Sequence, residues 1–396
     1  MANKKNFFLL FTSDFILRYG YQIGKMPLLP YFAITLGASE MLVGTILSIS
    51  TITGMILKPL VGFLSDNLGR KIWLLVACVF FSIFPFLYVF ISSPGELTII
   101  RLFHGIATAI FGPVSLALVA DLSHTHPSTR MGTFGMARSA AYLSAPVSAG
   151  LVLGYFSIEI AFYIIGIISI IGAIPILFLS SDYDKLESVQ VNGKNYMRKF
   201  RAALMSSFKI GLFNKSVWQA GLLEFLIHLV VYSVKVFLPL QILISESGTF
   251  LKAGAYLTIQ ELFHFLIRPL GGKLGDTFGD EKVILSGLIL MILSLLNLSI
   301  NESYELIFMS AALFGLGQAF SLPSSLSLII TDENKSDFGV KMGMVGAIRN
   351  SGKIIGPIFS GFLLLFISYD MLFLILALVC TSYVTFQIFK RNGIYL

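Results

Sequence analysis

Twelve stretches of about twenty predominantly apolar residues follow one another along this chain. Each is long enough for an α-helix to cross a bilayer, where a backbone must satisfy its own hydrogen bonds. Only 12% of the residues are charged and 56% are apolar, about half the charge of an ordinary soluble domain. We therefore predict an all-α membrane protein with twelve transmembrane helices. They cover roughly residues 6–34, 40–64, 72–92, 95–122, 131–155, 158–180, 215–244, 250–272, 283–300, 304–331, 338–367 and 369–389.

The net charge of +7 is distributed unevenly between the connections that join these stretches. Alternate connections carry eighteen lysines and arginines, whereas the other set carries only Lys252. Positively charged connections stay in the cytoplasm. We therefore expect both termini to be cytoplasmic, in a plasma or inner membrane, and the basic charge does not indicate a nucleic-acid partner. The cysteines, Cys78 and Cys380, lie inside apolar stretches, and no metal or cofactor site is expected.

One longer hydrophilic stretch, residues 181–214, divides the chain into two six-helix bundles, residues 1–180 and 215–396. Its basic residues alternate with apolar ones, as in a helix that lies on the anionic inner leaflet. The stretch is therefore predicted to be a cytoplasmic linker with an interfacial helix.

The two halves are copies of one another. A shift of 210 residues places Lys58–Gly69 on Arg268–Gly279 and Asp14 on Glu224, and a shift of 211 places Arg138 on Arg349. Polar residues are costly inside a bilayer, so their recurrence predicts two bundles related by a pseudo-twofold axis. Parallel six-helix repeats are the architecture of alternating-access transporters.

These motifs resemble those of the major facilitator superfamily over nearly the whole chain. The signature between the second and third spans is matched by Gly62, Asp66, Gly69, Arg70 and Lys71, and its second copy keeps Gly272, Asp276 and Gly279. Asp280 and Glu281 replace the basic pair in that copy. Arg101 and Gly105 resemble the span 4 motif. The span 5 motif of proton-driven drug antiporters is matched in spacing by Pro146 and Gly150, and in span 11 by Gly352, Gly356, Pro357 and Gly361.

The resemblance implies that Asp66 and Arg70 hold the cytoplasmic side closed, with Asp121 as the partner of Arg70. The alternative is a sharp turn with solvated charges. Small residues repeat every four positions in spans 5 and 11, which predicts closely packed helices. These ridges are either rocking contacts between the halves or ordinary helix packing.

Three carboxylates inside the membrane, Asp14, Glu224 and Glu261, are candidates for proton coupling. Asp14 has Arg18 four residues away and Arg138 at similar depth. Glu224 has His228 and Arg349 in the matching places. Structural ion pairs and switching pairs both fit this pattern. Glu261 has no charged repeat mate, and we expect it to be a proton carrier, a substrate ligand or a satisfied polar contact.

Cations outnumber acids within the spans, and three lysines are expected to lack an acidic partner. We predict substrate binding by the basic residues Arg18, His228, Arg138, Arg349, Lys353, Lys25 and Lys235. The expected partners are a small molecule, protons and the bilayer, and the chain is expected to be monomeric.

The predicted function is secondary active transport by alternating access, as an efflux-type proton antiporter. A proton-coupled symporter of an organic anion is the alternative, favoured by the excess of cations. A non-transporting sensor or membrane enzyme on the same fold is a further alternative, but no catalytic motif supports it.

Overall fold

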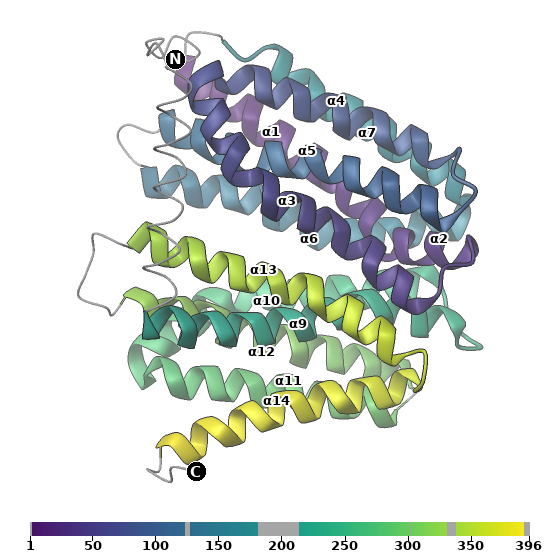
Figure 1. The fold of residues 1–396 in the computed structure, drawn as a ribbon, viewed down its shortest axis with the longest axis vertical. Helices are drawn as coiled ribbons and strands as arrows, with labels where there is room; N and C mark the ends of the chain where they lie inside the picture. The colour runs from purple at the N-terminus through teal and green to yellow at the C-terminus, as the bar shows by residue number, and fades with distance from the viewer. Residues whose placement is uncertain (1, 123–126, 181–213, 302, 331–337, 392–396) are drawn as a thin grey trace. The chain divides into compact units, whose positions relative to one another are not determined.

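The computed structural model describes residues 2–122, 127–180, 214–301, 303–330 and 338–391. Within these ranges all regular structure is helical (Figure 1). The prediction of an all-α membrane protein is confirmed, and the helices are consistent with a twelve-span architecture. The predicted linker and its interfacial helix lie almost wholly outside the described residues.

The first half begins with a span that is broken inside the membrane. Helix α1 (Ala2–Ile23) passes through a π-helical segment, η1 (Gly24–Leu28), into α2 (Leu29–Thr35). Pro27 lies in η1 and lacks the N–H that a regular helix needs, and Met26 adopts extended angles (φ −146°, ψ 124°). The remaining helices of this half are α3 (Glu40–Leu68), α4 (Arg70–Tyr88), α5 (Pro94–Asp121), α6 (Pro127–Tyr155) and α7 (Ile158–Leu177).

The second half contributes six long helices among its described residues. They are α9 (Lys215–Ile244), α10 (Phe250–Phe278), α11 (Asp280–Ile300), α12 (Tyr304–Ile330), α13 (Phe338–Leu363) and α14 (Tyr369–Arg391). Glycines set the tight joints of both halves: Gly69 joins α3 to α4 with φ 91°, and Gly279 joins α10 to α11 with φ 89°. Side chains other than glycine rarely adopt these angles.

Serine hydroxyls cap three helices of the first half. Ser39, Ser93 and Ser157 accept hydrogen bonds from backbone N–H groups at the starts of α3, α5 and α7, at 3.3–3.4 Å. A capped helix start satisfies one of the donors that the first turn leaves unpaired. These caps explain why the three helices begin where the apolar stretches begin.

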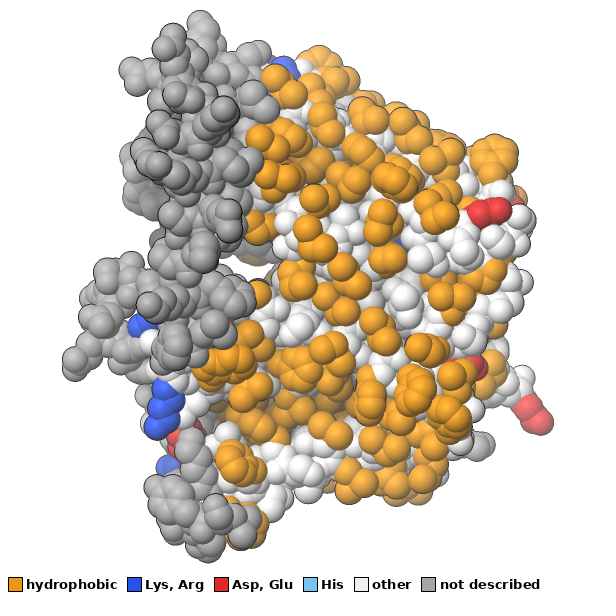
Figure 2. All heavy atoms as spheres, in the orientation of Figure 1, with side chains coloured by type: hydrophobic (Ala, Val, Ile, Leu, Met, Phe, Trp, Pro, Cys, Tyr) orange, Lys and Arg blue, Asp and Glu red, His pale blue; other side chains and the backbone are white. Residues whose placement is uncertain are grey.

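Within the described parts of the chain, eight helices are long and apolar enough to cross a membrane. The four long helices outside this group, α1, α6, α10 and α13, carry six of the ten residues predicted for proton coupling and substrate binding. Figure 2 shows one face, on which hydrophobic side chains cover most of the described surface and charged side chains lie mainly near the helix ends. Such a surface suits contact with lipid rather than with water.

The chain divides into two compact units. Unit 1 contains residues 1–191 and 242–255, and unit 2 contains residues 192–241 and 256–396. In unit 1, α5 packs against α3 and α4, and α1 packs against α6 and α7. In unit 2, α11 packs against α12 and α14. The bundle boundaries predicted from the repeat, 1–180 and 215–396, remain predictions.

Candidate functional site

Asp14 is the centre of a buried ionic cluster in unit 1. Its side chain is fully buried, and Arg18 Nε lies 2.9 Å from Oδ2. Arg138 donates to both carboxylate oxygens at 3.2 Å, and its Nη2 also donates to Ser115 Oγ at 2.9 Å. Both partners foreseen for Asp14 are therefore present together. The carboxylate of Asp14 thus forms charge-assisted hydrogen bonds with two guanidinium groups.

Glu224 is the repeat mate of Asp14, but its surroundings in unit 2 differ. Its side chain is 1% exposed and accepts a hydrogen bond from Ser325 Oγ. His228 Nδ1 lies 3.3 Å from Oε2 and 2.9 Å from the carbonyl oxygen of Glu224. Because a carbonyl oxygen only accepts, Nδ1 carries a proton. Among the described residues, no lysine or arginine forms an ion pair with Glu224.

The two corresponding arginines therefore differ: Arg138 bonds the carboxylate of its repeat, whereas Arg349 does not. Arg349 corresponds to Arg138, yet its Nε is buried without a hydrogen-bond partner. Ser325, which bonds Glu224 directly, is the repeat mate of Ser115 at the shift of 210. Sequence reasoning missed both serines, although the same alignment that paired Asp14 with Glu224 would have found them.

Glu261 forms an ion pair with Lys235, which joins α10 to α9 in unit 2. His264 Nδ1 lies 3.6 Å from the other carboxylate oxygen. The expectation that Lys235 lacks an acidic partner is wrong. Lys235 and Glu261 are 26 positions apart on neighbouring helices. The sequence indicated only the depth of each residue in the membrane, which is not enough to predict that their side chains meet.

Two lysines lie close to the ring of Tyr232 in unit 2. The Nζ atoms of Lys235 and Lys353 are 5.7 and 5.4 Å from the ring centroid. His228 is one turn away, with its ring centroid 6.4 Å from that of Tyr232. The ring of Tyr232 therefore has two lysine side chains beside it, one from α9 and one from α13. In unit 1, the predicted substrate residue Lys25 lies in the π-helical segment η1.

The predicted gating motif holds an ion pair across unit 1. Arg70 Nε lies 3.1 Å from Asp121 Oδ2, and Arg70 Nη1 donates to Ser65 Oγ at 3.0 Å. Lys71 donates to the carbonyl oxygen of Leu179 at 2.6 Å. The expected contact between Arg70 and Asp121 is therefore present. The side chain of Asp66 lies outside the described residues, and Gly62 faces open space.

The second copy of the gating motif makes a different contact in unit 2. Asp280, at the place of Arg70, accepts a hydrogen bond from Ser327. Gly279 supplies the joint with positive φ, Gly272 faces open space, and Asp276 is exposed. A single hydroxyl thus replaces the ion pair of the first copy.

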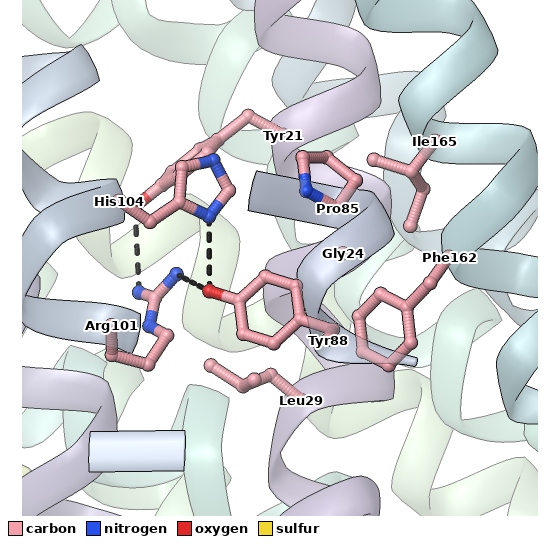
Figure 3. Close-up of a pocket in the computed structure, with 9 residues that line it drawn as sticks. All are labelled: Tyr21, Gly24, Leu29, Pro85, Tyr88, Arg101, His104, Phe162 and Ile165. Carbon is pink, nitrogen blue, oxygen red and sulfur yellow. Dashed lines mark hydrogen bonds between the residues drawn. The ribbon is translucent and has the colours of Figure 1, made fainter. Parts of the chain in front are cut away.

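Arg101 lies in a fully buried polar cluster of unit 1 (Figure 3). It donates to Ser50 Oγ at 2.8 Å and to the hydroxyls of Tyr21 and Tyr88 at 3.4 and 3.5 Å. The Tyr88 hydroxyl also bonds His104 Nδ1 at 2.9 Å. A cavity of about 10 Å³ lies beside these groups, enough for about one water molecule. Sequence reasoning found Arg101 but not the hydroxyls that surround it.

Gly105 explains how α5 approaches α3 at this cluster. A Cβ at this position would lie 2.9 Å from Ser50 Cα and 3.0 Å from Thr53 Cβ. The close approach allows Arg101, one turn earlier, to reach Ser50.

The sequence model of the Major Facilitator Superfamily matches residues 8–240 and 220–391. The chain belongs to the major facilitator superfamily. Its relatives include an uncharacterised transporter of this superfamily from Methanocaldococcus jannaschii, 25% identical over 366 residues, with 91% of each chain covered. The quinolone resistance protein NorA of Staphylococcus aureus is 23% identical over 380 residues, covering 90% of this chain and 89% of that protein.

The fold of this superfamily member also matches solved transporters. The nucleoside transporter NupG superimposes with a TM-score of 0.83 at 15% identity, over 99% of this chain and 100% of that one. At this identity the likeness concerns the fold alone. The superfamily and the Methanocaldococcus relative are membrane transporters, so the protein is a transporter and not an enzyme.

The small residues of the superfamily's span 5 and span 11 patterns lie at close helix contacts. A Cβ at Gly352 would lie 3.1 Å from Phe225 Cα, and one at Gly356 would lie 3.0 Å from Leu229 Cα. Span 11 therefore packs against α9 inside unit 2. A Cβ at Gly150 would lie 3.0 Å from Leu251 Cα, inside unit 1. The neighbouring pattern residues Pro146, Pro357 and Gly361 are all buried.

Proposed function

We propose that this protein is a proton-coupled secondary transporter that exports amphiphilic compounds by alternating access. Two relatives support the substrate class, because one is a quinolone resistance protein and another, from Proteus mirabilis, is a multidrug resistance protein. Their identities of 23% and 25% leave the substrate itself open to experiment. The spacing of Pro146 and Gly150, similar to that of drug antiporters, supports the same class.

Glu224 carries the proton in this proposal. The other two membrane carboxylates are neutralised by cations: Asp14 by Arg18 and Arg138, and Glu261 by Lys235. Glu224 is just as buried but has only a serine hydroxyl and a histidine ring beside its oxygens. A buried carboxylate without a cationic partner is suited to bind and release a proton during transport.

The gate of the proposed mechanism is the contact between Arg70 and Asp121 in unit 1, with Asp66 as its third member. Closing the gate forms a charge-assisted contact that opening must break. The gate lies on the cytoplasmic side if both termini are cytoplasmic, as the distribution of lysine and arginine predicts.

Proton movement in proteoliposomes tests this proposal. Purified protein is reconstituted at a fixed pH gradient, and tetraphenylphosphonium or benzoate is added while the internal pH is recorded. Proton release driven by the lipophilic cation is expected for the wild type and is lost in Glu224→Gln. Glu305→Gln is the matched control, because Glu305 is exposed at the start of α12. Unchanged proton release in Glu224→Gln would overturn the assignment of the carrier.

A second function, symport of an organic anion with a proton, is favoured by one observation. Lys353 Nζ lies 5.4 Å from the centroid of the Tyr232 ring, and Arg349 is on the same helix, one turn away. Such a site would attract a carboxylate or a phosphate. Proton entry together with benzoate would support this alternative and exclude export by antiport.

A further inference from the structure

The two repeats hold corresponding polar residues in two different arrangements. In unit 1, Arg138 bridges Asp14 and Ser115. In unit 2, Ser325 bonds Glu224 directly and the arginine is not part of the contact. The serine and the arginine are the same in both repeats, whereas the acid is Asp14 in unit 1 and Glu224 in unit 2, and His228 stands at the place of Arg18.

Unit 2 also contains two complementary groups that are buried without hydrogen bonds. Neither Oε2 of Glu224 nor Nε of Arg349 has a hydrogen-bond partner, although His228 Nδ1 lies 3.3 Å from Oε2. The free energy cost of leaving such groups unpaired is large in a low-dielectric interior. In unit 1 the same two kinds of group bond each other at 3.2 Å. A contact between them is therefore the arrangement in which neither group remains unpaired.

We propose that Arg349 and a proton compete for Glu224. With Glu224 ionised, Arg349 bonds its carboxylate as Arg138 bonds Asp14. With Glu224 protonated, Arg349 withdraws and the carboxyl group keeps Ser325 and His228 as its neighbours, the arrangement of this structure. Arg349 and Ser325 are thus positioning residues of the proton site. The inference rests on the proposed role of Glu224 as the proton carrier.

Four cationic or titratable side chains surround Glu224 in this structure. His228 faces it from α9, Arg268 from α10, and Arg349 and Lys353 from α13, while α12 contributes the neutral Ser325. Arg349 is the member of this set whose repeat mate bonds the corresponding carboxylate. Its removal should therefore favour the protonated form of Glu224 more than the removal of a distant cation does.

Infrared difference spectroscopy of the purified full chain tests the proposal. The band of the protonated carboxyl group is titrated between about pH 4 and pH 10, and the component that disappears in Glu224→Gln belongs to Glu224. In Arg349→Gln the midpoint of that component is expected to rise by about one to three pH units, because a guanidinium beside a carboxylate opposes protonation by this amount. Arg349→Lys keeps the charge and should remain closer to the wild type. Lys282→Gln, an exposed change on α11, is the control.

Two results would overturn the proposal. One is an unchanged midpoint in Arg349→Gln protein that melts like the wild type. The other is the absence of any titrating Glu224 component. If Arg349→Gln does not fold, Arg349→Met takes its place, because it also removes the charge and should raise the midpoint in the same direction. Failure of the transport function is distinguishable, because the midpoint shift would then persist in a protein that moves no protons in proteoliposomes.

Discussion

Replacing Gly356 by alanine should separate α13 from α9 and destabilise unit 2. The new Cβ would lie 3.0 Å from both the carbonyl carbon and the Cα of Leu229. Carbon atoms in contact prefer about 3.5–4.0 Å, so the helices must move apart by about 0.5–1 Å. Overpacking of this kind costs about 1–3 kcal/mol.

Gly343→Ala on the same helix is the matched control. No atom lies within 4 Å of the Cβ that it would add. Both variants gain the same helix propensity, about 0.5–1 kcal/mol. The difference between their free energies of unfolding therefore isolates the cost of overpacking at Gly356.

The two cysteines make the assay specific for one unit. Cys78 lies in α4 of unit 1 and Cys380 in α14 of unit 2, and both are buried. In a Cys78→Ala background, a thiol-reactive fluorescent dye reports the thermal opening of unit 2 through Cys380. We expect Gly356→Ala to melt about 2–12 °C below Gly343→Ala. Equal melting temperatures would refute the close contact between α13 and α9.

Three further outcomes are expected. Tyr88→Phe removes the hydroxyl that bonds His104, which should destabilise unit 1 by about 1–3 kcal/mol. Dye labelling of Cys78 in a Cys380→Ala background measures this change. Labelling at the same temperature as in the protein with Tyr88 would contradict the buried bond. Arg70→Ala should slow gradient-driven transport in proteoliposomes, and exchanging the charges of Arg70 and Asp121 should restore part of the rate; a normal rate in Arg70→Ala would count against the gate. Glu261→Gln should keep proton coupling but lower the melting temperature, because Lys235 loses its partner; loss of coupling in folded Glu261→Gln protein would argue for Glu261 as the carrier.

The spans, the duplication and the superfamily are properties of the linear sequence. A bilayer requires about twenty apolar residues for each helix. The apolar composition of each segment therefore predicts the spans. A duplication keeps its register along the chain, which is why Asp14 could be aligned with Glu224 and Ser115 with Ser325. The gating contact between Arg70 and Asp121 was also foreseen, because the resemblance to the superfamily implied it.

The partner of each buried charge was decided only by the tertiary structure. Asp14 takes both arginines offered by the sequence, Glu224 takes Ser325 in place of Arg349, and Glu261 takes Lys235. These choices depend on how far each helix is rotated and shifted against its neighbour, and a change of about one ångström makes or breaks a hydrogen bond. Hydropathy and repeat spacing place a residue at a depth in the membrane, but the packing of side chains between helices determines which group it meets.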